Sequence, residues 1–214
     1  MKKLIALVLS LLAVSSLVAG CSSGKGTTVN SGEKSVTFSL LSSPASLDPA
    51  TTTDGHSLMV ETQLFSMLVE SKGGTSNEIK PDIAESWEIS EDGLTYTFKL
   101  RDDVYFHNGK LLTADDVVYT FNRVMTEPYT SYYAAPIKSV EATDEHTFVA
   151  HLNYPFADFL TLVGGIYFGI CCEEAITAGS DFMYKPVGTG PYKLEGGYIP
   201  GQAFKFVYND QYYG

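Results

Sequence analysis

Stretches in which apolar and polar residues alternate predict most of the strands of this chain, because a strand with one wet face buries every second side chain. Residues 86–89 and 94–100 flank a turn of Ser, Glu, Asp and Gly, which predicts a hairpin. A second hairpin is predicted where residues 143–145 separate two further runs. The full set of predicted strands is 36–40, 86–89, 94–100, 137–142, 146–152 and 203–208.

Apolar residues spaced by three and four positions predict two amphipathic helices. The first runs from His56 to Val69, and the Gly-Gly pair at 73–74 is expected to end it. The second is expected to begin at residues 113–116, where a capping threonine precedes two aspartates placed at the positive end of the helix dipole. A short helix is expected over 157–163. Helices and hairpins mixed in this way indicate an α+β unit.

The start of the chain has the features of a secretory signal peptide with a lipoprotein cleavage box. Lys2 and Lys3 precede an apolar run over 4–18, and two small residues stand just before Cys21. The run is short for a permanent membrane span. We therefore expect cleavage after residue 20 and a lipid-modified Cys21 that anchors the protein. The alternative is an ordinary signal peptide with a chance cysteine.

Composition narrows the class of protein. Residues 21–35 contain almost no apolar side chain and are expected to form a flexible tether. Removing residues 1–20 leaves 194, enough for one domain with a substantial core or for two small lobes. The chain is 44% hydrophobic, as globular proteins are. Its net charge of −11, nearer −13 without Lys2 and Lys3, argues against nucleic acid as a partner.

The sequence offers no clear catalytic or metal-binding constellation. Cys171 and Cys172 are adjacent, which makes a disulfide between them difficult, so we interpret them as buried core residues, with a vicinal redox pair as the alternative. The paired carboxylates at 115–116 and 173–174 have no partner base or nucleophile, and no catalytic role is assigned to them. Metal ligation is not predicted either, because the histidines lack zinc-like spacing: His56, His107, His146 and His151.

Residues 188–191, Gly-Thr-Gly-Pro, contain two glycines but are not interpreted as a phosphate-binding loop. Such loops continue with Lys and Ser or Thr and lead into a helix, and this segment does neither. It is expected to be a structural crossover between two subdomains.

Several segments, in order along the chain, together resemble the peptide/nickel-binding family (family 5) of bacterial extracellular solute-binding proteins, which serve ABC importers. Any one of these segments is weak evidence, but their order makes the resemblance specific. The segments are Ser46-Leu47-Asp48-Pro49, 79–87, 93–101, Phe106-His107-Asn108-Gly109-Lys110, 113–120, 186–194 and 209–214.

The resemblance implies the first lobe of a two-lobed periplasmic-binding-protein-like fold of type II, of mixed α+β and α/β character. It implies a base subdomain made of 36–69 and 185–214, with a smaller α+β subdomain, 70–184, inserted between them. Family members are more than twice as long as this chain. We therefore expect an N-terminal fragment in which the second lobe is missing.

The implied function is that of a lipid-anchored receptor, not an enzyme, that delivers oligopeptides or dipeptides to an ABC importer. Its implied partners are a small peptide, the membrane permease and the ATPase, with no cofactor and no nucleic acid. The implied location is the outer face of the cell membrane, or the periplasm of a two-membrane cell. A nickel complex or haem is the alternative ligand. A lipid-anchored hydrolase is disfavoured because it would need a nucleophile-base pair or metal ligands, and a non-functional gene fragment is a third possibility.

By the same resemblance, the ligand is expected to contact two regions of the chain. The first is the loop and helix mouth at Thr53, Asp54, Gly55 and His56. Asp54 is also a natural helix cap, so capping alone is an equal alternative. The second region contains Tyr132 and Tyr133, whose phenols offer a flat apolar face and a hydroxyl group to a peptide. Their alternative role is packing in the core or on the surface.

Overall fold

The computed structural model describes residues 39–71, 78–179 and 181–214. The predicted signal peptide, Cys21, the tether, most of the strand at 36–40 and the glycines at 73–74 lie outside these ranges. Among the residues that the structure does describe, none belongs to a helix that is long and apolar enough to cross a membrane.

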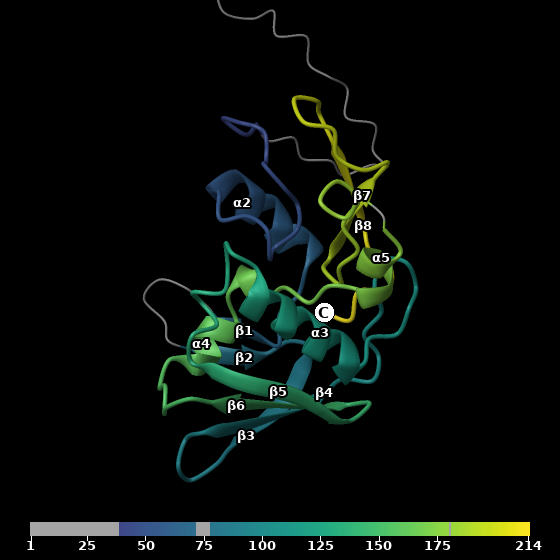
Figure 1. The fold of residues 1–214 in the computed structure, drawn as a ribbon. Coiled ribbons are helices and arrows are strands. Elements are labelled where there is room, and N and C mark those ends of the chain that lie inside the picture. Colours follow the sequence, from purple (N-terminus) through teal and green to yellow (C-terminus); the bar gives the residue numbers. More distant parts are fainter. Residues whose placement is uncertain (1–38, 72–77, 180) are drawn as a thin grey trace, which may run out of the picture. The chain divides into compact units, whose positions relative to one another are not determined.

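An antiparallel four-stranded sheet forms one part of the described chain (Figure 1). Its strand order is β3-β4-β6-β5, so the two predicted hairpins are confirmed and lie side by side through β4 and β6. Tyr96, Phe98 and Leu100 of β4 point into the core, and the residues between them face outward. The strands are β3 (Ala84–Ile89), β4 (Thr95–Leu100), β5 (Ile137–Asp144) and β6 (Thr147–Leu152).

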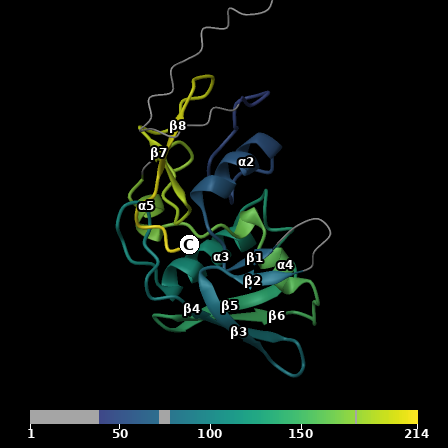
Figure 2. The same ribbon diagram turned by 180° about the vertical axis from the view of Figure 1, so that it is seen from behind.

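Helix α3 (Ala114–Thr126) covers one face of this sheet, as both views show (Figures 1 and 2). It begins as predicted, because Thr113 and Asp116 form a reciprocal capping box. Its apolar stripe is buried, and the ring of Phe121 lies 4.7 Å from that of Phe148 on β6. The helix and the sheet therefore share one aromatic core.

A second hydrophobic cluster joins helix α2 (Gly55–Leu64) to a small hairpin of β7 (Tyr192–Glu195) and β8 (Lys205–Tyr208). Chain segments distant in sequence meet there, and the Tyr198 hydroxyl donates a 2.7 Å hydrogen bond to the carbonyl of Pro44. The buried residues of this cluster are Leu47, Val60, Leu64, Phe65, Cys171, Phe182 and Tyr198.

Helix α2 ends earlier than the predicted Val69. The N–H of Gly190 donates to the carbonyl of Leu64, which removes an acceptor that a longer helix would use, and Phe65 is extended. The chain then enters β1 (Val69–Ser71), which pairs with β2 (Ile79–Pro81). The apolar residues after Leu64 therefore belong to a strand and its approach rather than to a helix.

The remaining elements are short. They are α4 (Phe159–Val163), the 3₁₀ helix η1 (Ile166–Phe168) and α5 (Glu173–Thr177). The predicted short helix is thus present, shortened at its start. Cys171 and Cys172 are free thiols buried beside these elements, which confirms their interpretation as core residues.

The loop Gly188-Thr189-Gly190 lies directly against the C-terminal end of α2. A Cβ atom on Gly188 would stand 2.1 Å from the carbonyl oxygen of Leu64, and one on Gly190 would stand 2.6 Å from the carbonyl carbon of Leu64. Only glycine permits this approach of two backbones. The loop also receives the N–H of His107 at the carbonyl of Gly188, so it joins three separate segments.

This approach yields a first prediction. Gly188→Ala should lower the free energy of unfolding by about 3 kcal/mol, because a side chain forced against fixed backbone costs roughly 1–3 kcal/mol or more. Gly55→Ala is the matched control, since a Cβ there meets no atom within 4 Å and should change stability by less than about 1 kcal/mol. Urea unfolding followed by circular dichroism measures both, and equal stability of the two variants would contradict the packing argument.

Candidate functional site

The first predicted ligand region lies at the N-terminus of α2. Asp54 is the N-cap residue, and its Oδ1 accepts hydrogen bonds from the N–H groups of His56 (3.0 Å) and Ser57 (3.2 Å). The capping role of Asp54 is therefore confirmed. Thr53 and Gly55 are exposed, whereas Asp54 and His56 are half-buried. Ligand contact by these four residues stays a prediction.

The carboxyl group of Asp54 is ionised at neutral pH and lies at the N-terminus of α2. Partial burial favours the neutral acid, but hydrogen bonds from Ser57, Ala45 and Thr52 outweigh that effect and lower the pKa of Asp54 to about 2. Its Oδ1 also lies 3.8 Å from Nδ1 of His56, and Ser42 Oγ lies 2.9 Å from the same nitrogen. Polar contacts thus attach the loop before α2 to the first residues of the helix.

The second predicted region follows α3 in the chain. The ring of Tyr133 stacks on that of Tyr167 with centroids 4.2 Å apart, and their hydroxyls are hydrogen-bonded at 3.4 Å. Tyr132 is 84% exposed and meets Tyr133 edge to face. The two tyrosines therefore differ: Tyr133 packs on the protein, while Tyr132 presents its phenol to solvent. Tyr129, which the sequence argument missed, is also exposed on this segment.

Two contacts tie the two regions together through their neighbours. Arg123 donates to both oxygens of Asp48, at 3.0 and 2.7 Å, and both side chains are largely buried. Thr130 donates to the carbonyl of Ala50 at 3.1 Å. Among the described residues, no hydrogen bond, ion pair or ring contact joins Thr53–His56 directly to Tyr132 or Tyr133. The loops that carry them are nevertheless fixed to each other.

A buried acid in α2 was not foreseen. Glu61 has no exposed surface, and neither of its carboxylate oxygens has a hydrogen-bond partner. Desolvation, with added repulsion from Asp48 and Asp54, raises the pKa of Glu61 from 4.5 to about 8. The available signal was its position on the buried face of the helix, one turn after Ser57 and three residues before Leu64.

The site offers recognition groups of several kinds. Tyr132 supplies an aromatic face and a hydroxyl, the exposed loop at Thr53–Gly55 supplies backbone and side-chain polar groups, and Asp54 supplies a negative charge. Within the described ranges, His, Cys, Asp and Glu side chains form no group of three that could hold a metal ion. These groups suit the binding of a small polar molecule with an apolar portion.

Comparison with known proteins places the chain among binding proteins. The family described as bacterial extracellular solute-binding proteins, family 5 Middle, matches residues 78–214. Heme-binding protein A of Haemophilus influenzae is 36% identical over 197 residues, covering 79% of this chain and 36% of its own. The dipeptide-binding protein of Escherichia coli is 32% identical over 208 residues, covering 85% and 38% of the two chains.

A solved structure shows the same fold. The periplasmic binding protein DppA of Helicobacter pylori, determined in complex with the peptide STSA, superposes with a TM-score of 0.72 at 33% identity. The match covers 81% of this chain and 38% of that one. The fold is therefore that of the type II periplasmic binding proteins, and the chain spans little more than a third of the length of these relatives.

Glu61 generates a prediction about pH. Below pH 4.5 the acid is neutral in folded and unfolded chains alike. Between pH 4.5 and 8 only the unfolded chain ionises, so stability is lost as pH rises, at about 1.4 kcal/mol per unit and up to about 5 kcal/mol in total. The gain in stability of Glu61→Gln over the wild type should therefore be larger at pH 8 than at pH 5.

Urea unfolding of both proteins at the two pH values measures this difference. Glu88→Gln, at an exposed position of β3, is the control and should leave the pH dependence as in the wild type. If Glu61→Gln and the wild type share one pH dependence, Glu61 is ionised in the folded protein.

Proposed function

The chain belongs to family 5 of the bacterial extracellular solute-binding proteins, and on that basis we propose that it is part of a receptor that binds a short peptide and delivers it to an ABC importer. Relatives named for dipeptides, and a related structure holding a peptide, support the peptide as ligand. The proposed partners are the membrane permease and the ATPase of the importer. The proposed role is binding and delivery without chemical change of the ligand.

The observation that carries this proposal is the clamp formed by Asp48 and Arg123. It fixes the loop before α2 to helix α3, and the bond from Thr130 to the carbonyl of Ala50 fixes the same loop to the segment after α3 that carries Tyr132. A binding surface needs such rigidity, because each loop that must be ordered on binding reduces affinity. We propose that the peptide lies against Tyr132 and Tyr133 and that its polar backbone reaches Thr53, Asp54, Gly55 and His56.

We also propose a division of the chain. The base subdomain would comprise 36–69 and 185–214, and 70–184 would be an inserted subdomain. The two hydrophobic clusters support this division, because the sheet and α3 surround one of them and α2 with the β7–β8 hairpin surrounds the other. The division is not strict, because Leu68 and Val69 of 36–69 belong to the first cluster and Cys171 and Phe182 of 70–184 belong to the second.

Haem is the second candidate ligand, favoured by the match to Heme-binding protein A. The two ligands can be separated by titration of the protein purified from its natural host. Haem binding shifts the Soret band, whereas a dipeptide alters the melting temperature without any colour. A Soret shift at micromolar haem with no response to dipeptides would replace the peptide proposal.

The ligand surface is tested by Tyr132→Ala. Loss of an exposed aromatic face should weaken dipeptide binding about tenfold, corresponding to roughly 1.4 kcal/mol, without changing stability. Tyr154→Ala removes another exposed phenol from a loop after β6 and should leave the affinity unchanged. Isothermal titration calorimetry measures both variants, and equal affinities for both would exclude Tyr132 as a ligand contact.

The final part of the proposal is a lipid anchor at Cys21, which would hold the receptor on the outer face of the membrane. Two acyl chains give stable attachment, since each buried methylene contributes about 0.8 kcal/mol. Mass spectrometry of the native N-terminus should find cleavage before Cys21 and an added diacylglycerol mass. In Cys21→Ser that mass should be absent and the protein should leave the membrane fraction. An unmodified Cys21 in the native protein would rule out the anchor.

A further inference from the structure

A cavity of about 420 Å³ opens where three segments of the chain meet, and it contains none of the residues assigned to the ligand surface above. One wall comes from the loop of His107 and Asn108, and another from Lys185 and the residues that follow it. The third comes from β7 and the glycines after it. The lining residues are His107, Asn108, Lys185, Pro186, Val187, Lys193, Leu194, Gly196 and Gly197.

The charge of this cavity is opposite to that of the protein. The chain has a net charge of −11, yet two lysines and no acidic residue line the cavity. Lys185 is exposed and has no ion-pair partner among the described residues. Lys193 pairs at 3.1 Å with Asp210, whose side chain is 84% exposed, so this pair is weak and open to exchange.

His107 is a fixed, neutral wall of the cavity. One ring nitrogen lies 3.1 Å from the carbonyl oxygen of Gly190, and the other accepts a hydrogen bond from the N–H of Gly188 at 3.4 Å. Burial lowers the pKa of His107 to about 4, so the ring carries no charge at neutral pH. Because both ring nitrogens are hydrogen-bonded to the backbone, His107 forms part of the cavity wall and has no free nitrogen to offer a ligand.

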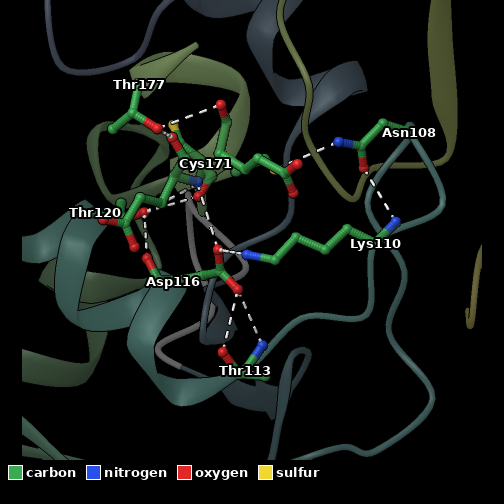
Figure 3. A network of polar contacts seen from close by, with 10 residues as sticks. Asn108, Lys110, Thr113, Asp116, Thr120, Cys171 and Thr177 are labelled. Atoms are coloured by element: carbon green, nitrogen blue, oxygen red, sulfur yellow. Dashed lines mark hydrogen bonds and ion pairs between the residues drawn. The ribbon is translucent and has the colours of Figure 1, made fainter.

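Asn108 is held in place by the network shown in Figure 3. Its side-chain amide donates to Sγ of Cys172 at 3.6 Å, and its oxygen accepts from the N–H of Lys110 at 3.1 Å. The ammonium group of Lys110 is in turn bound to the buried Asp116 at 2.5 Å. Lys110 is therefore held by a buried acid, whereas Lys193 has only the exposed Asp210 as its partner and Lys185 has no ion-pair partner among the described residues.

The rest of the lining is apolar or open. Pro186, Val187 and Leu194 provide apolar surface, and the stem of Lys185 passes close to Gly197, where a Cβ would stand 3.0 Å from its Cγ. Gly197 has a positive φ of 89°, so a side chain there would be both strained and crowded. The glycine thus leaves room for the stem of Lys185.

We propose that this cavity binds a small organic carboxylate, whose charged head lies between Lys185 and Lys193 and whose apolar body packs on Val187 and Leu194. Charge-assisted hydrogen bonds from ammonium groups suit a carboxylate, and the volume is within the range of small-molecule sites. Because the protein as a whole repels anions, binding depends on these two lysines. This site shares no residue with the proposed peptide-binding surface, so a test of one proposal does not decide the other.

Hexanoate is a suitable probe, with hexanamide as its uncharged counterpart. Titration of the full chain, followed by the amide resonances of Gly196, Gly197 and Asn108, should give saturable shifts with hexanoate and none with hexanamide. Acetate, which lacks the apolar body, should bind at least about fivefold more weakly, because each buried methylene favours binding by a few-fold.

Variants identify the lysines. Lys185→Gln and Lys193→Gln should each weaken hexanoate binding about tenfold. Lys205→Gln is the charge-matched control, since Lys205 is exposed on β8, pairs with Glu195 and does not line the cavity, and it should change the affinity less than twofold. Unchanged resonances elsewhere show that each variant is folded.

Three results would overturn the proposal. Equal shifts with hexanoate and hexanamide would show that charge plays no part. Equal weakening by Lys205→Gln would show a general response to net charge rather than a site. Acetate binding as tightly as hexanoate would eliminate the apolar part of the cavity as a contact.

Discussion

The contact between the backbone of Gly188-Thr189-Gly190 and the end of α2 determines how the other parts of this chain meet. The loop accepts His107 N–H at Gly188, donates from Gly190 to Leu64, and receives the side chain of Asn209 at the carbonyl of Gly190. Three segments distant in sequence are thereby held by one short stretch. Two glycines are needed because no Cβ fits between the facing backbones.

Two buried carboxylates of the protein are paired with basic side chains. Asp48 is matched by Arg123 and Asp116 by Lys110, so each of these buried carboxylates has a cation. Glu61 is buried without one, and Asp48, Asp54, Tyr167 and Cys171 are the titratable groups that its charge affects or that affect it. Burial of an unpaired charge is costly, and neutralisation by a proton is the usual relief. The loop that ends at Asp54 thus leads into a helix with one unmatched acid.

The sequence predicted the elements that depend on residues close to one another in the chain. The hairpins follow from alternation and turn residues, the start of α3 follows from its capping box, and Asp54 follows from its capping chemistry. The end of α2 could not be predicted, because the group that stops it, Gly190, is remote in sequence. The Asp48–Arg123 clamp is equally remote. The sequence left open whether Tyr132 and Tyr133 pack in the core or on the surface, and it did not indicate Glu61, whose isolation depends on three-dimensional packing.

The unmatched acid in α2 also bears on the motions of the protein. A ten-residue helix is too short to be stable alone and depends on the surface it packs against. Opening of α2 would hydrate Glu61 and let it ionise, so the free-energy gap between the closed helix and a locally opened form narrows as the medium becomes alkaline. The sheet and α3 have no such unpaired acid in their shared core among the described residues. Local opening of α2 therefore costs less free energy as the pH rises.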